Sequence, residues 1–179
     1  GIAGMAIGMA MNGMPPVIEM QFDAFPYPAF EQIVSHVAKM HNRTKGAVKL
    51  PMVIRVPYAG GIGGVEHHCD SSEAYYAHTA GLKVFTPATV ADGYRMLREA
   101  IDSDDPVMFM EPKKLYWSKA ELDLPVKTAP FGTAEIRRAG TDATIVTYAA
   151  SVPVALEAAQ AAMDSGQDLE VVDLRRRLP

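Results

Sequence analysis

The amino-acid sequence predicts an α/β fold built around a parallel sheet. Short apolar runs, typical of buried strands, alternate along the chain with stretches whose apolar residues recur at helical spacing. Near the C-terminus a strand, a helix and a second strand follow one another over residues 143–150, 153–163 and 169–174. Two strands joined through a helix indicate neighbouring parallel strands.

The first helix is expected over residues 1–13, GIAGMAIGMAMNG, with Gly13 closing it. Gly4 and Gly8 lie four residues apart on one face of this helix, and each costs about 1 kcal/mol relative to Ala. A close approach of another backbone would compensate for this cost. Packing inside the domain and packing against another chain both stay open as explanations.

The remaining elements of the first part follow in alternation. Strands are expected over residues 16–22, 50–57, 83–87 and 107–110. Helices are expected over residues 28–41, 71–78 and 89–101. Asp70 and Glu73 resemble a capping box, Gly81 follows as a helix stop, and Thr89 is the expected N-cap of the helix over residues 89–101. Residues 118–130 show no clear period and predict a linker.

Composition and charge exclude several classes of protein. Hydrophobic residues make up 49% and charged residues 21% of the 179 residues, which is typical of a globular protein of one domain or parts of two. The net charge of −4 gives no reason to expect a nucleic acid or an acidic membrane as partner. The longest apolar stretch has 11 residues, too short for a membrane span of about 20, and no charged segment precedes it as in a signal peptide. A single cysteine permits no internal disulfide.

The segment VEHHCDSSEAYYAHTAGLKV, residues 65–84, carries three of the five histidines and the only cysteine. A transition-metal site is disfavoured, because the adjacent His67 and His68 cannot easily point at one ion. Cys69 as a nucleophile needs an activating base, and adjacency to a histidine in sequence is not a triad. His68 follows a glycine-rich loop and precedes a helix, where α/β proteins place their sites. The residues alone therefore predict an α/β protein with a possible site around His68.

Three longer stretches occur in one order over nearly the whole chain: GIAGMAIGMAMNGMPPVIEMQFDAFPYPAFEQI, RVPYAGGIGGVEHHCDSSEAYYAHTAGLKVFTPAT and AIDSDDPVMFMEPKKLYW. Together they resemble the β subunit of the thiamine-diphosphate-dependent 2-oxo acid dehydrogenases. MEPKKLYW and HTAGLKV look closer to the branched-chain (2-oxoisovalerate) enzymes than to pyruvate dehydrogenases. The resemblance implies an oxidoreductase that decarboxylates a branched-chain 2-oxo acid oxidatively and passes the acyl group to a lipoyl group.

The resemblance also implies an architecture. A three-layer, pyrimidine-binding parallel-sheet domain would cover residues 1–116, a linker residues 117–130, and the start of a transketolase-type C-terminal α/β domain residues 131–179. The chain lacks an initiator Met and begins just after the position of a family glutamate that contacts the pyrimidine ring, so it resembles a fragment. On its own we expect it to be inactive and to self-associate.

Cofactors and partners follow from the same resemblance. Thiamine diphosphate would lie at a subunit interface, with its diphosphate and Mg²⁺ held by an α subunit. A second β subunit would complete a heterotetramer, and a lipoyl-carrying acyltransferase would accept the acyl group. The bacterial cytoplasm, or the mitochondrial matrix in a eukaryote, is the expected compartment. Another enzyme of the superfamily (a transketolase, or a pyruvate or acetoin dehydrogenase) and a non-catalytic assembly or binding module stay open as alternatives.

Site residues are carried over by position. Phe25 matches the aromatic ring against the pyrimidine, and Gln21 a further cofactor contact. Substrate-channel positions fall on Phe22, Asp23 and Ala24. His68 matches a histidine that holds the substrate carboxylate and donates a proton to the lipoyl sulfur, which an imidazole can do near neutral pH. After it, residues 69–72 depart from the family's usual Ser-Gln/Glu-Ser-Pro. Potassium would be bound through the backbone carbonyls of Met52, Ala100, Ile101, Ser103 and Asp105.

Overall fold

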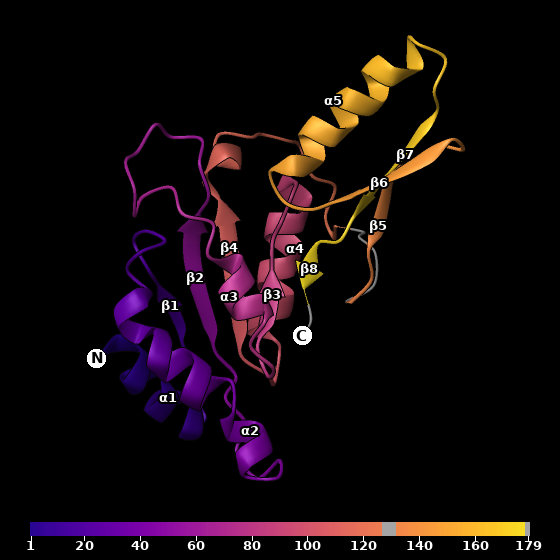
Figure 1. Ribbon diagram of the computed structural model, residues 1–179. Helices are drawn as coiled ribbons and strands as arrows, with labels where there is room; N and C mark the ends of the chain where they lie inside the picture. Colours follow the sequence, from indigo (N-terminus) through magenta and orange to yellow (C-terminus); the bar gives the residue numbers. More distant parts are fainter. Residues whose placement is uncertain (127–131, 178–179) are drawn as a thin grey trace.

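A computed structural model describes residues 1–126 and 132–177, and its larger sheet holds five strands in the order β1-β2-β4-β3-β8 (Figure 1). The first four of these are parallel. They are β1 (Val17–Glu19), β2 (Val53–Tyr58), β4 (Val107–Pro112) and β3 (Lys83–Phe85). The predicted α/β fold with a parallel sheet is confirmed.

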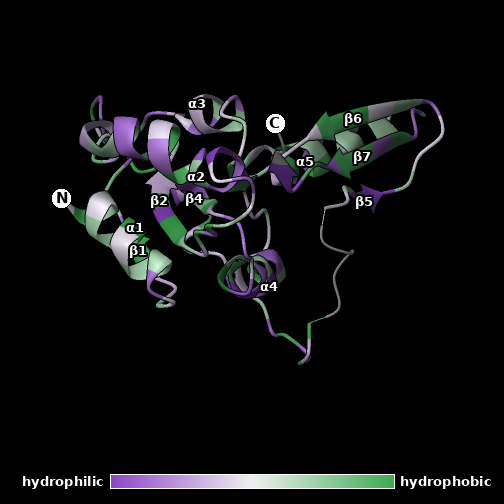
Figure 2. Ribbon diagram, turned by 90° about the horizontal axis from the view of Figure 1, so that it is seen from below, coloured by the Kyte–Doolittle hydropathy of each residue, from purple (hydrophilic) through white to green (hydrophobic). Residues whose placement is uncertain are grey.

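Helices cover both faces of this sheet, and the strands alternate their side chains between the two. Ile54 and Met108, paired across β2 and β4, belong to the core under α1, η2 and α3, whereas Val53 and Phe109 belong to the core under α4. Figure 2 shows α3 and α4 on opposite sides of the strands. The helices are α1 (Ile2–Met11), η1 (Tyr27–Ala29), η2 (Gln32–Val37), α2 (Met40–Arg43), α3 (Glu73–Ala77), α4 (Val90–Ile101) and η3 (Lys113–Leu115).

A smaller sheet follows in the order β5-β7-β6. Its elements are β5 (Glu135–Arg138), β6 (Ala143–Thr147), α5 (Ser151–Met163) and β7 (Leu169–Asp173). β6 and β7 are parallel, as the strand–helix–strand pattern predicts. Two strands are not predicted by the sequence: β5, antiparallel to β7, and β8 (Arg176–Arg177), which returns to the larger sheet and pairs antiparallel with β3. Of the predicted linker, residues 118–126 contain no helix or strand, and residues 127–130 lie outside the described part.

The predicted helix over residues 28–41 is broken into short pieces of different type. Its middle part is the π-helix η2, in which the Ala38 amide donates to the Ile33 carbonyl over five residues. The wider turn brings Ile33, Val37 and Ala38 to one buried side. Ala38 in turn faces Gly81, where a Cβ would overlap the Ala38 carbonyl oxygen, and the φ of +99° also requires glycine.

The first helix ends as predicted, with Gly13 at a φ of +78°. Its glycine face is open. Apart from the neighbouring residues and the backbone of the same helix, no heavy atom of the described residues lies within 4 Å of a Cβ built on Gly4 or Gly8, so close packing among these residues does not explain the two glycines. Ala3, Ala6 and Ala10 form the buried side of the helix instead.

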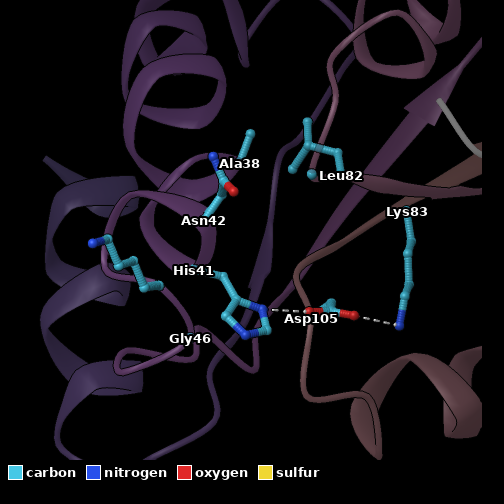
Figure 3. A pocket seen from close by; sticks show the side chains of 9 residues that line it. Ala38, His41, Asn42, Gly46, Leu82, Lys83 and Asp105 are labelled. Atoms are coloured by element: carbon cyan, nitrogen blue, oxygen red, sulfur yellow. Dashed lines mark hydrogen bonds and ion pairs between the residues drawn. The ribbon is translucent and has the colours of Figure 1, made fainter.

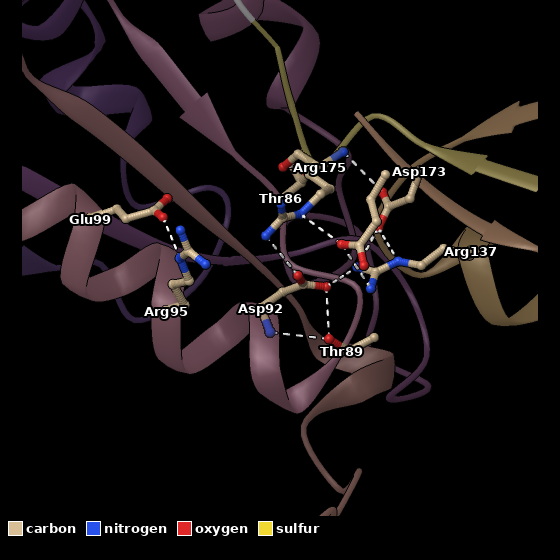
Figure 4. Close-up of polar contacts among 9 residues, drawn as sticks. Thr86, Thr89, Asp92, Arg95, Glu99, Arg137, Asp173 and Arg175 are labelled. Atoms are coloured by element: carbon tan, nitrogen blue, oxygen red, sulfur yellow. Dashed lines mark hydrogen bonds and ion pairs between the residues drawn. The ribbon is translucent and has the colours of Figure 1, made fainter. Parts of the chain in front are cut away.

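A buried charge network joins the two sheets (Figure 4). Asp92, in the first turn of α4, accepts from Arg137 of β5 and, at 3.0 Å, from Arg175 after β7. Arg137 also donates to Asp173 at 2.8 Å. Burial outweighs these contacts and raises the pKa of Asp173.

The predicted cap at Thr89 is confirmed, since its hydroxyl accepts from the Asp92 amide. None of the described helices is both long and apolar enough to span a membrane.

Candidate functional site

Three loops meet at the carboxyl edge of the larger sheet. Because β1, β2 and β4 are parallel, the segments that follow them leave the sheet at the same edge. The first loop contains residues 20–26, the second residues 59–72, and the third begins at Lys113. The positions matched to the cofactor, the substrate and the reacting histidine all fall on the first two loops.

Phe22 and His68 bring the first two loops into contact. Their ring centroids lie 4.6 Å apart with the planes inclined by 65°, an edge-to-face arrangement. Phe22 also meets Phe25, with ring centroids 6.1 Å apart. Phe25 is 49% exposed, so the ring has an accessible face. The half-exposed face of Phe25, next to the Phe22–His68 pair, is a flat apolar surface that fits an aromatic heterocycle such as a pyrimidine.

The two adjacent histidines face different surroundings. His68 is half-buried, and its Nδ1 lies 3.4 Å from the Glu66 carbonyl oxygen. His67 is exposed, has a φ of +70°, and lies 3.6 Å from an Asp70 carboxylate oxygen. The thiol of Cys69 donates to the Gly64 carbonyl at 3.4 Å.

Asp70 ties the second loop, residues 59–72 and here called the histidine loop, to Tyr27, which directly follows the first loop. Its side chain accepts from the Tyr27 hydroxyl at 3.1 Å, and its carbonyl accepts from the Ala59 amide at 2.8 Å. Burial together with Asp70 raises the pKa of Tyr27. The predicted capping box of Asp70 and Glu73 is therefore wrong: α3 begins after Ser72 without a side-chain cap, because Asp70 bonds to a partner 43 residues away.

Asp23 makes a contact that the sequence does not predict. Its carboxylate is fully buried and accepts from Lys113 Nζ at 2.8 Å. Lys113 is itself 3% exposed, which is unusual for a lysine. Part of a signal is visible in retrospect, because Asp23 is a lone charge within the apolar run QFDAF, whereas Lys113 stands among the other charges Glu111 and Lys114. Of the other matched positions, Gln21 is exposed and Ala24 is half-buried.

The residues matched to potassium directly precede β2 or lie in the stretch from the end of α4 to the start of β4, at the opposite edge of the sheet. One of them, Asp105, lines a pocket of about 570 Å³ (Figure 3). Three of the matched carbonyls already accept hydrogen bonds: Met52 from the Val107 amide, Ala100 from the Ser103 amide, and Asp105 from the Ser103 hydroxyl. Each of these three carbonyl oxygens keeps a second lone pair. The other two carbonyls matched to potassium are those of Ile101 and Ser103. Potassium binding stays a prediction. No group of three or more His, Cys, Asp and Glu side chains suited to a metal ion occurs within residues 1–126 and 132–177.

The Asp105 side chain lies in the same pocket between the His41 imidazole and the Lys83 ammonium. It is 3.1 Å from His41 Nδ1 and 2.9 Å from Lys83 Nζ. Burial would raise the pKa of Asp105, but the hydrogen bonds from Lys83 and His41 outweigh it and lower the pKa.

Comparison with known proteins agrees with this architecture. Residues 1–118 match the family model of the transketolase pyrimidine-binding domain, and residues 132–179 that of the transketolase C-terminal domain. The pyruvate dehydrogenase E1 component subunit beta of Leifsonia xyli is 54% identical over 179 residues, 100% of this chain and 53% of the relative. The 3-methyl-2-oxobutanoate dehydrogenase subunit beta of Mycobacterium tuberculosis is 50% identical, covering 99% of this chain and 51% of the relative.

The chain thus spans about half the length of these relatives. Among solved structures, a split-gene transketolase described as an inactive beta4 tetramer superposes with a TM-score of 0.78 at 25% identity, over 96% of this chain and 52% of that one. The transketolase of Campylobacter jejuni shares the fold, with a TM-score of 0.76 at 18% identity over 97% of this chain and 26% of that one. The chain therefore belongs to the transketolase family, with a pyrimidine-binding domain followed by the C-terminal domain of that family.

Proposed function

We propose that this chain is part of the β subunit of the decarboxylating component of a 2-oxo acid dehydrogenase, acting on branched-chain 2-oxo acids. The observation that carries the proposal is the Phe22–His68 pair beside the half-exposed Phe25, at the carboxyl edge of a pyrimidine-binding domain. Similarity to dehydrogenase β subunits over the whole chain supports it. The division into domains at residues 1–116 and 131–179 is part of the same proposal.

Phe25 and Gln21 are the residues that would hold the pyrimidine of thiamine diphosphate. The exposed face of Phe25 offers a flat apolar surface to the ring, and the exposed Gln21 amide can hydrogen-bond to it. When bound, the cofactor supplies the electron sink that decarboxylation of a 2-oxo acid requires. The diphosphate and Mg²⁺ would be held by an α subunit.

His68 would bind the substrate carboxylate and transfer a proton. Because the Glu66 carbonyl can only accept, Nδ1 carries a hydrogen there, which leaves Nε2 free to face the substrate. In the imidazolium form, Nε2–H can donate to the carboxylate and later transfer its proton to a lipoyl sulfur. The contact with Phe22 restricts the plane of the ring, and the contact of Nδ1 with the Glu66 carbonyl distinguishes the two orientations of the ring in that plane, and so the direction of Nε2.

A second candidate is the same role in a pyruvate dehydrogenase, which the name of the Leifsonia xyli relative favours. The names of the Mycobacterium tuberculosis and Bacillus subtilis relatives, the latter a 2-oxoisovalerate dehydrogenase subunit beta at 41% identity, favour the branched-chain role.

The two candidates differ in their substrates, so one assay tests both. The complete protein that contains this chain is purified with its α subunit, supplied with thiamine diphosphate and Mg²⁺, and assayed for decarboxylation of 3-methyl-2-oxobutanoate and of pyruvate in parallel. We expect the higher kcat/KM with 3-methyl-2-oxobutanoate. A higher value with pyruvate would select the second candidate, and no turnover of either acid would contradict both.

A further inference from the structure

A buried ion pair lies directly behind the candidate site. Asp23 follows the first strand, and Lys113 follows the fourth in chain order, with β2 between those two strands in the sheet. Their side chains are 0% and 3% exposed, and Lys113 Nζ lies 2.8 Å from Asp23 Oδ2. The pair therefore ties together two loops that are not neighbours along the sheet edge.

The carboxylate depends entirely on this lysine. Within residues 1–126 and 132–177, Asp23 Oδ1 is buried and has no hydrogen-bond partner, and Lys113 is the donor to Oδ2. Removing one partner of a buried ion pair leaves an uncompensated charge, which typically destabilises a protein far more than the intact pair stabilises it. Without the ammonium, the segment that carries Asp23 has to admit water or move.

That segment carries the rings of the site. Phe22 directly precedes Asp23, and its carbonyl accepts from the Phe25 amide at 3.0 Å, so a shift of Asp23 moves both rings. Lys114, the next residue after Lys113, packs against the histidine loop. A Cβ on Gly61 would lie 2.7 Å from Lys114 Cβ, which shows how closely the two backbones pack.

We propose that Lys113 is a positioning residue: its ammonium holds Asp23 in the interior, and thereby keeps Phe22 against His68 in the geometry that meets the 2-oxo acid. The inference rests on the proposed function for its substrate, but its geometric part does not. It predicts that the position of His68 depends on Lys113 whether or not any substrate turns over.

Three variants of the complete α/β enzyme test the role. Lys113→Met removes the charge at similar length. Asp23→Asn/Lys113→Met also removes the orphaned carboxylate. Lys114→Met is the matched control, since Lys114 is exposed and Met keeps the Cβ and Cγ that face Gly61. Each is measured for urea stability, for kcat/KM with the 2-oxo acid, and for the NMR signal of His68 in [¹³C]histidine-labelled protein, which senses the Phe22 ring.

We expect Lys113→Met to lose stability, to shift the His68 signal and to lower kcat/KM at least about tenfold, with Lys114→Met within about threefold of the parent. The double variant should regain stability but keep the shifted signal and the low kcat/KM, because the tether is still missing. Recovery of signal and activity together with stability would overturn the proposal, since it would show a purely structural role.

If Lys113→Met does not fold, the double variant alone decides. A His68 signal at the parent's position would then overturn the proposal, and a displaced signal would support it. A parent enzyme without turnover would contradict the proposed function only, because the histidine signal is read without substrate.

Discussion

The phenyl ring of Phe22 meets the imidazole of His68 edge-on, with centroids 4.6 Å apart. This contact joins the loop after β1 to the loop after β2, and it orients the one histidine of the adjacent pair that is half-buried. An aromatic edge-to-face pair is worth about 0.5–1.5 kcal/mol beyond its buried area.

Replacing Phe22 by Ala should therefore lower kcat/KM of the complete enzyme by about two- to tenfold, since 1.4 kcal/mol corresponds to a factor of ten. Tyr75→Ala is the matched control. It removes a similar T-shaped contact, to Phe30 with centroids 6.0 Å apart, away from the two loops. Steady-state kinetics on both variants checks this, and equal losses would argue against a special role for the Phe22–His68 contact.

Asp92 should be essential for the connection between the two sheets. It is fully buried and accepts from Arg137 and Arg175, so Asp92→Ala leaves two partly buried guanidinium groups without this partner. We expect a loss of about 3–5 kcal/mol in the free energy of unfolding. Asp102→Ala, at the exposed end of the same helix, should cost less than about 0.5 kcal/mol. Urea denaturation measures both, and similar midpoints would contradict the prediction.

Gly81 and Gly93 should respond to alanine in opposite directions. At Gly81 the φ of +99° and the overlap of a Cβ with the Ala38 carbonyl should destabilise the protein by more than about 2 kcal/mol. Gly93 lies within α4 with nothing within 4 Å of a Cβ, so Gly93→Ala should stabilise it by up to about 1 kcal/mol. Thermal unfolding distinguishes them, and a tolerated Gly81→Ala would refute the close approach of Ala38.

Asp105 should contribute stability that depends on pH. Because its pKa is lower in the folded chain than in the unfolded one, the unfolded chain binds more protons around that pH. The contribution is therefore complete well above pH 4 and is lost as the pH falls below about 4. Asp105→Asn should be less stable than the parent at pH 7 and should match it at pH 2–3. A difference that persists at low pH would contradict the assignment to this carboxylate.

The parallel sheet and the loops of the site could be predicted because their signals are local. Val53–Tyr58 and Val107–Pro112 begin in mainly apolar runs, with two helical patterns and the strand at residues 83–87 between them, and such runs are typical of strands covered on both faces. Parallel strands place the segments after them at one edge, so the location of Phe25 and His68 in loops at that edge follows from the fold.

The parts that the sequence could not predict depend on long-range contacts. Asp23 and Lys113 lie 90 residues apart, and nothing near either residue indicates its partner. The π-helix at Gln32–Val37 adds a residue to a turn, which a search at a period of 3.6 does not detect. Arg176–Arg177 is strongly charged, and it becomes a strand because the edge of β3 offers backbone partners.

The most direct test of the central claim, that His68 carries the chemistry of this site, compares His68→Ala, His67→Ala and Cys69→Ser in the complete enzyme. Acyl transfer to a lipoyl acceptor and affinity for thiamine diphosphate are measured for each. We expect His68→Ala to lose between about 10²- and 10⁴-fold in turnover, with much less change in cofactor affinity. The other two should stay within about threefold of the parent. If His67→Ala or Cys69→Ser is the inactive variant instead, the assignment of His68 is wrong.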